Sequence, residues 1–132
     1  MQRYLIYLTF AFAAAIAFAT LASVSIPYAI YYKSAPWLGN PDMHNFATIE
    51  HLLVFAVLGA LLDFAFPKRI IIVLSTVFVG VTLLEALQTL TADRHGTILD
   101  ACQKVTGGFV GALMVHMITW WRRVPGNENN KI

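Results

Sequence analysis

The stretch that decides the fold is residues 85–111, EALQTLTADRHGTILDACQKVTGGFVG. It places strongly polar side chains between two long apolar runs and ends in a group of glycines. Its strongly polar side chains include Glu85, Gln88, Arg94, Asp100 and Lys104. Charge is costly at the edge of a bilayer, so a group of charges that flanks and enters two membrane helices indicates a working site.

The composition of the whole chain indicates a membrane protein. Of its 132 residues, 58% are hydrophobic and 12% are charged, whereas soluble domains carry about 25% charged residues. This length suits one domain, residues 1–132, and is too short for a membrane bundle plus a soluble domain. The net charge is only +2, and the basic residues stand near segment ends rather than along one face, so we expect no nucleic-acid partner.

The apolar runs predict an all-α bundle of four membrane-spanning helices. The first run, residues 4–32, contains no Asp, Glu, Lys or Arg and exceeds the roughly 20 residues that a span needs. It is also longer than the apolar core of a signal peptide, about 7–15 residues, so we expect a retained anchor. The other spans and the polar tail are predicted at residues 49–66, 70–90, 97–121 and 124–132.

Positive charges predict the orientation of this bundle. In a four-span arrangement, Arg3, the pair Lys68-Arg69 and the pair Arg122-Arg123 all fall on one side. The positive-inside rule then places both termini and the turn at residues 67–69 in the cytoplasm. The protein is therefore expected to be a multi-pass protein of the bacterial inner (cytoplasmic) membrane.

The same topology brings the polar residues to one membrane level, on the outer side. Glu50 and His51 begin the second span, Glu85 and Gln88 end the third, and Asp100 and Lys104 begin the fourth. Arg94 lies in the short loop between the last two spans. This convergence does not depend on the positive-inside rule, so it supports the four-span topology independently.

Helical periodicity divides the fourth span into an upper polar half and a lower packing half. Asp100, Lys104, Gly107 and Gly111 form one stripe, in which Asp100 can pair with Lys104. Gly107 and Gly111, together with the adjacent Gly108, permit another helix to approach closely. If the third span ends near Leu90, Glu85 lies ~7 Å below the outer end of that helix, because each residue adds about 1.5 Å. We therefore expect a shallow polar pocket that opens to the outer leaflet above packed glycines.

These positions resemble the VanZ-like membrane proteins, a family named for a teicoplanin-resistance protein. The family pattern has a His eight residues before a Gly, then Glu-x-x-Gln, a loop Arg, an Asp, an Asn or Lys four residues later, and Gly-x-x-x-Gly. The matching residues here are His51, Gly59, Glu85, Gln88, Arg94, Asp100, Lys104, Gly107 and Gly111. The resemblance covers residues 47–115 and implies a single VanZ-like membrane domain.

Two positions depart from that pattern. The family often has Asp-Lys where this chain has Ala47-Thr48, and Glu50 is a candidate for the missing acid. Lys104 stands where Asn is common, which changes the local charge. The resemblance implies a role in the cell envelope, in surface polysaccharide or in glycopeptide resistance, but it implies no particular reaction.

Three hypotheses of function follow. In the first, the pocket binds a membrane lipid or a lipid-linked or anionic envelope component, with Arg94 and Lys104 on phosphate or carboxylate. In the second, the protein is an enzyme on such a substrate, with His51, Glu85 or Asp100 as candidate catalytic groups and the two cations stabilising a developing anion. In the third, the protein is a structural subunit whose glycines pack against a second copy or another membrane protein.

A structural ion-pair network that orders the outer loop is the alternative to both site hypotheses. Three further residues have structural interpretations: Asp63 as a local partner of Lys68 and Arg69, His116 as a helix–helix hydrogen bonder, and Cys102 as a small buried thiol. A metal site from Glu50, His51, Glu85 and Asp100 would lack dedicated spacing such as His-Glu-x-x-His. We therefore expect no metal and no cofactor.

Overall fold

The computed structural model describes residues 2–21, 32–33, 36–37, 43–90 and 97–123. Within these residues the long elements are four α-helices, which confirms the predicted all-α class. They are α1 (Gln2–Leu21), α3 (Met43–Ala65), α4 (Ile70–Thr89) and α5 (Ile98–Trp121). All four are long and apolar enough to cross a membrane, so length and composition indicate a multi-pass membrane protein.

The helix ends differ from the predicted spans mainly at α3. This helix begins at Met43 rather than at about Ile49, so Glu50 and His51 lie two turns inside it instead of at its start. Helix α5 begins after Thr97, whose side chain caps it by accepting a hydrogen bond from the Asp100 N–H at 3.1 Å. Residues 22–31 of the first predicted span and the tail at 124–132 lie outside the described residues.

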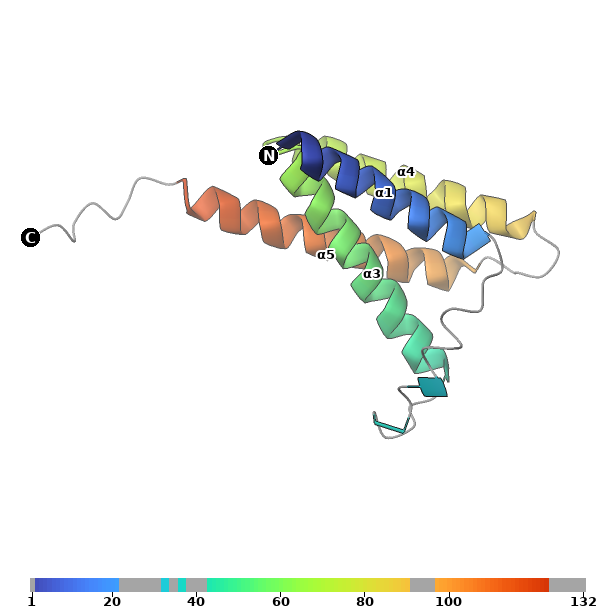
Figure 1. Ribbon diagram of the computed structural model, residues 1–132. Coiled ribbons are helices and arrows are strands. Elements are labelled where there is room, and N and C mark those ends of the chain that lie inside the picture. The colour runs from blue at the N-terminus through green and yellow to red at the C-terminus, as the bar shows by residue number, and fades with distance from the viewer. Residues whose placement is uncertain (1, 22–31, 34–35, 38–42, 91–96, 124–132) are drawn as a thin grey trace, which may run out of the picture.

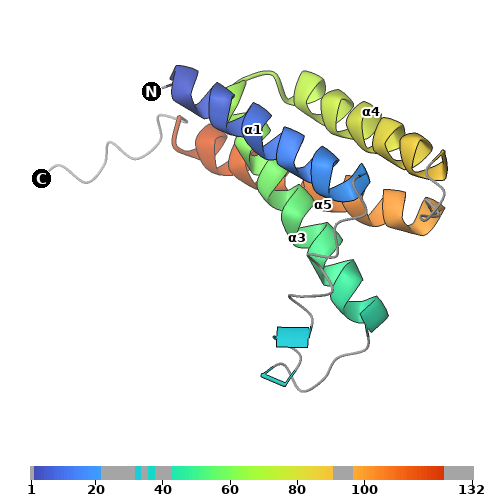
Figure 2. The ribbon, with the colours of Figure 1, turned by 45° about the vertical axis from the view of Figure 1, so that its right-hand side comes forward.

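The helices alternate in direction, so the start of α1, the end of α3, the start of α4 and the end of α5 share one end of the bundle (Figure 1). Helices α1, α4 and α5 run roughly alongside one another. Helix α3 crosses α5 obliquely, and its amino-terminal end extends away from the other three helices (Figure 2). We call the end with the amino terminus the N-terminal end and the other end the loop end.

Glycines allow the backbones of α3 and α5 to touch where they cross. A Cβ atom on Gly59 would overlap the carbonyl oxygen of Gly108, and one on Gly111 would overlap that of Ala56. A Cβ atom on Gly107 would likewise overlap the carbonyl oxygen of Leu52. Lipid chains are as apolar as side chains, so helix association in a membrane depends on this kind of close packing.

The apolar side chains divide between a small core and a large outer surface. Phe55, Val77, Val81 and Ile16 form a buried cluster between the helices, whereas many large apolar side chains are exposed on the outside. An apolar exterior is what a bundle surrounded by lipid requires. Cys102, predicted to be buried, lies instead on the exposed surface of α5.

The crossing predicts a sharp difference between two glycines in helix interiors. Gly111→Ala forces a methyl group against the α3 backbone and should lower the free energy of unfolding by about 3 kcal/mol, the upper end of overpacking costs. Gly80 on α4 has nothing within 4 Å of the position its Cβ would take. Gly80→Ala should therefore be neutral or stabilising by up to about 1 kcal/mol. Denaturation in mixed micelles, followed by circular dichroism, measures the free energy of unfolding of both variants. Equal losses of stability in the two variants would contradict the described crossing.

Candidate functional site: a polar cluster at the loop end

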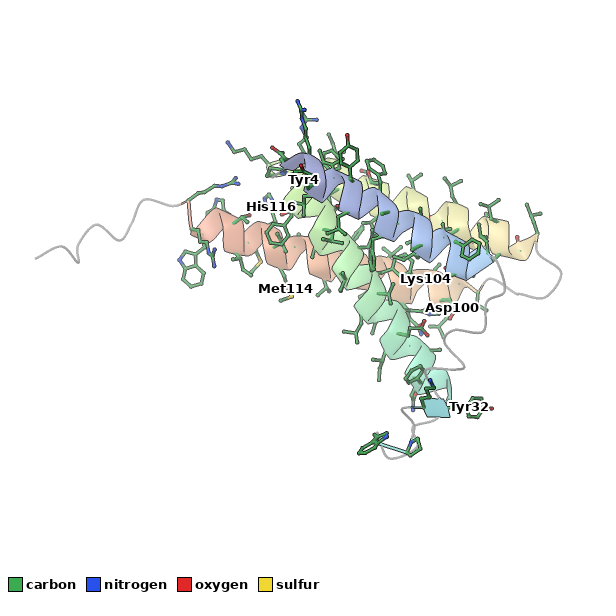
Figure 3. The ribbon with its side chains drawn as sticks, in the orientation of Figure 1. Tyr4, Tyr32, Asp100, Lys104, Met114 and His116 are labelled. Atoms are coloured by element: carbon green, nitrogen blue, oxygen red, sulfur yellow. The ribbon has the colours of Figure 1, made fainter. Side chains whose placement is uncertain are left out.

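An ion pair between α4 and α5 is the centre of the polar cluster. The Lys104 ammonium lies 2.6 Å from Oε2 of Glu85, and Figure 3 shows Lys104 in the first half of α5. The second carboxylate oxygen of Glu85 accepts a hydrogen bond from the backbone N–H of Thr97 at 2.9 Å. One carboxylate therefore ties α4 to both the amino-terminal cap and the second turn of α5.

Gln88, one turn beyond Glu85 on the same face of α4, extends the network. Its amide oxygen lies 3.5 Å from the Lys104 ammonium, and its amide nitrogen lies 3.3 Å from the carbonyl oxygen of Thr20 in α1. With the Gln88 amide flipped, its nitrogen instead donates to the two carboxylate oxygens of Glu85 at 3.2 and 3.3 Å. In either orientation, Gln88 contacts the ion pair inside the bundle.

Burial separates this network from the surface. Lys104 is 2% exposed, Gln88 6% and Glu85 8%. Among the described residues, no buried side-chain nitrogen or oxygen lacks a hydrogen-bond partner. A charge inside an apolar bundle is tolerated when it is paired and hydrogen-bonded. The network is therefore closed, and its buried polar atoms are satisfied inside the described bundle.

A second layer, half-exposed, joins α3 to α5. Nδ1 of His51 lies 3.3 Å from the Gln103 amide oxygen, and the Gln103 amide donates to the Thr48 hydroxyl at 3.2 Å. Because that amide oxygen only accepts, the contact requires the proton on Nδ1 of His51. Asp100 lies 3.8 Å from the same nitrogen, and the His51 and Asp100 side chains are 26% and 31% exposed. This layer presents donors and acceptors to its surroundings.

The predicted site residues are partly brought together. Glu85, Gln88 and Lys104 meet directly, and His51 meets Asp100, while Glu50 is half-buried one residue before His51. The predicted pairing of Asp100 with Lys104 along α5 is replaced, because the lysine turns inward to a carboxylate on another helix. Arg94 and its neighbour His95 lie outside the described residues.

Sequence reasoning missed the polar residues that connect the predicted ones. Gln103 and Thr48 link α3 to α5, and Thr97 links α4 to α5. Gln103 stands three residues after Asp100 and therefore on a neighbouring helical position, which was an available signal. The acceptor at Thr20 is a backbone carbonyl, for which the sequence carries no signal.

Asp63 also has a partner other than the one predicted. Its carboxylate is 2% exposed and lies 3.2 Å from Nδ1 of His116 on α5, whereas Lys68 and Arg69 are exposed. The local pairing expected for Asp63 is therefore wrong, and the helix–helix role expected for His116 is observed. This pair lies toward the N-terminal end, and His116 is labelled there in Figure 3.

In the part of the chain that the structure describes, no group of three or more His, Cys, Asp or Glu side chains is arranged to hold a metal ion. No protein-family model, no curated protein and no solved structure matches the chain.

The ion pair predicts strongly non-additive stability effects. Lys104→Met leaves the Glu85 carboxylate buried without a cation and should lower the free energy of unfolding by about 3–5 kcal/mol. Glu85→Leu should have a similar effect by leaving the ammonium unpaired. The double variant should recover most of the loss, because an apolar pair can replace a buried ion pair.

Unfolding midpoints in mixed micelles measure all three variants. Arg122→Met, which removes an exposed cation just beyond α5, is the control and should change stability by less than about 1 kcal/mol. A double variant that loses the sum of the two single losses would show that Lys104 and Glu85 are not energetically coupled.

Proposed function

We propose that the protein is a binding module of the bacterial inner membrane, which recognises the polar headgroup of a lipid-linked cell-envelope component at its loop end. The observation that carries this proposal is the half-exposed layer of His51, Asp100 and Gln103, held in place by the buried ion pair beneath it. Preorganised donors and acceptors at the rim of an apolar bundle suit a ligand with an apolar anchor and a polar head.

The chemistry of this layer favours a head rich in hydroxyl groups. Lys104 is neutralised by Glu85 and is buried, so it is not available as a phosphate anchor. The exposed groups are a carboxylate, an imidazole and an amide, which accept from and donate to sugar hydroxyls. We also propose that Arg94 contacts the phosphate of a lipid-linked sugar, since a guanidinium can bind two phosphate oxygens at once.

The resemblance to VanZ-like proteins supplies the biological setting of the proposal. Those proteins are associated with the cell envelope, surface polysaccharide and glycopeptide resistance, and we propose a lipid-linked envelope precursor as the ligand. A module that holds such a precursor would link this chain to the same processes.

The contacts of Glu85 argue against this residue as a general base. Both carboxylate oxygens are engaged, one by the Lys104 ammonium and one by the Thr97 N–H. A general base must reach the proton that it removes, and a buried carboxylate in two strong contacts does not. The third hypothesis, a structural subunit, needs a glycine face open to a partner, yet α3 of the same chain covers Gly107 and Gly111.

Binding of a polyprenyl-phosphate-linked disaccharide in detergent micelles, measured by native mass spectrometry, tests the proposal. Asp100→Asn and His51→Phe should each weaken binding about tenfold or more, since a hydrogen bond to a charged group contributes about 1.5–3 kcal/mol. Polyprenyl phosphate without sugar should bind more weakly to the wild-type protein and respond less to both substitutions.

The matched control is Cys102→Ser, a conservative change at an exposed position two residues from Asp100. Its affinity for the disaccharide lipid should equal that of the wild-type protein. The proposal fails if Asp100→Asn and His51→Phe keep full affinity while their unfolding midpoints remain normal.

The proposed orientation has its own test. In a Cys102→Ser background, a cysteine at Ile98, which is 85% exposed at the loop end, should react with a membrane-impermeant maleimide added to intact cells. A cysteine at Arg122, at the opposite end, should react only after the cells are permeabilised. The reverse pattern would place the loop end in the cytoplasm and would remove the outer-leaflet ligand from the proposal.

A further inference from the structure

An open cavity of about 310 Å³ lies at the N-terminal end, away from the polar cluster described above. Its wall combines the turn between α3 and α4, the first residue of α4, the last two turns of α5 and Arg123 just beyond them. The lining residues are Lys68, Ile70, His116, Thr119, Trp120 and Arg123. The volume falls within the range of about 300–1,000 Å³ that small-molecule sites occupy.

Positive charge dominates this wall. Lys68 and Arg123 both line the cavity, one from the α3–α4 turn and one from just beyond α5. The nearby carboxylate, Asp63, is buried and faces Nδ1 of His116, so the imidazole intervenes between that carboxylate and the cavity. The pocket therefore carries two cations, with its nearest described acid engaged elsewhere.

The chain holds Lys68 in place at a conformational cost. The Arg69 N–H donates to the Phe66 carbonyl at 3.3 Å, and Lys68 has a φ of 70° after Pro67. Proline at the second position and a positive φ at the third are features of a type II turn, in which glycine is the usual third residue. A lysine there costs about 1–2 kcal/mol relative to glycine, so the turn carries an ammonium group at a position where glycine would be less strained.

The start of α4 adds to the positive character of the wall. Helix α4 has no side-chain cap and no acidic residue in its first turn, so the partial positive charge of its amino terminus is not neutralised by the helix itself. Trp120 is 64% exposed beside the cavity. Tryptophan concentrates at the level of lipid headgroups, which places the cavity at that level.

We propose that this cavity binds a phosphate group, with Lys68 and Arg123 as its two cationic contacts and Trp120 packing beside it. The phosphate is that of an anionic lipid headgroup, or inorganic phosphate from the adjoining solution; both present the same anionic oxygens. Arg123 can engage two of these oxygens at once through its planar guanidinium, while Lys68 acts as a point charge.

Quenching of Trp120 fluorescence tests the proposal on the full-length chain. The chain has three tryptophans. The background variant carries Trp37→Phe and Trp121→Phe, so that Trp120 is its only remaining tryptophan. Phosphatidylcholine vesicles receive an equal mole fraction of either brominated phosphatidylglycerol or brominated phosphatidylcholine. A preference for the anionic lipid at the cavity appears as excess quenching by brominated phosphatidylglycerol.

The variants separate pocket contacts from general surface charge. Arg123→Gln and Lys68→Gly should each weaken the preference about tenfold or more, the effect of losing a hydrogen bond to a charged group. Lys68→Gly also removes the left-handed strain, so its loss of binding cannot arise from a destabilised turn. Arg122→Gln removes a neighbouring exposed cation that does not line the cavity and should weaken the preference at most about fivefold.

A second arm identifies the source of the phosphate. Inorganic phosphate is added to the single-tryptophan protein in neutral detergent micelles. A saturable change in Trp120 fluorescence that is lost in Lys68→Gly assigns the site to soluble phosphate; excess quenching in vesicles without that change assigns it to the lipid headgroup. The proposal is overturned if neither signal appears, or if Arg122→Gln weakens the preference as much as Arg123→Gln.

Discussion

The direct backbone contact between α3 and α5 is the constraint on which the polar sites depend. Because Gly59, Gly107 and Gly111 lack side chains, the two helices approach closely while running in the same direction. That approach brings His51 to Gln103 on one side of the crossing and Asp63 to His116 on the other. Larger residues at the crossing would separate both pairs, and each contact would then have to be replaced inside an apolar bundle.

The buried ion pair decides which groups remain for a ligand. Lys104 is enclosed with Glu85 and Gln88, and the capping residue Thr97 is tied to the same carboxylate. A network in which every polar atom is satisfied is rigid and is costly to disturb. It therefore serves as the support, and the half-exposed His51 layer above it becomes the surface on which recognition is proposed.

Sequence reasoning brought several of the polar residues to the same end of the bundle but assigned some of their contacts wrongly. Spacing placed Glu85, Gln88 and Lys104 near one end of their helices, and there they meet. Spacing along α5 also favoured Asp100 as the partner of Lys104, and proximity in sequence favoured Lys68 for Asp63. Both acidic residues are found instead beside a histidine on another helix, because a long-range partner depends on how each helix is rotated about its axis.

The sequence by itself determined the number of long apolar helices, their alternating directions and the end at which the polar residues gather. These features follow from hydropathy, helix rise and short connections, which are properties of single segments. Only the tertiary structure decided that Lys104 is closed inside the bundle, that α3 covers the glycines of α5, and that Lys68 and Arg123 line one cavity. The physical reason is that burial and partner choice depend on the crossing and rotation of helix pairs, which periodicity within one helix does not specify.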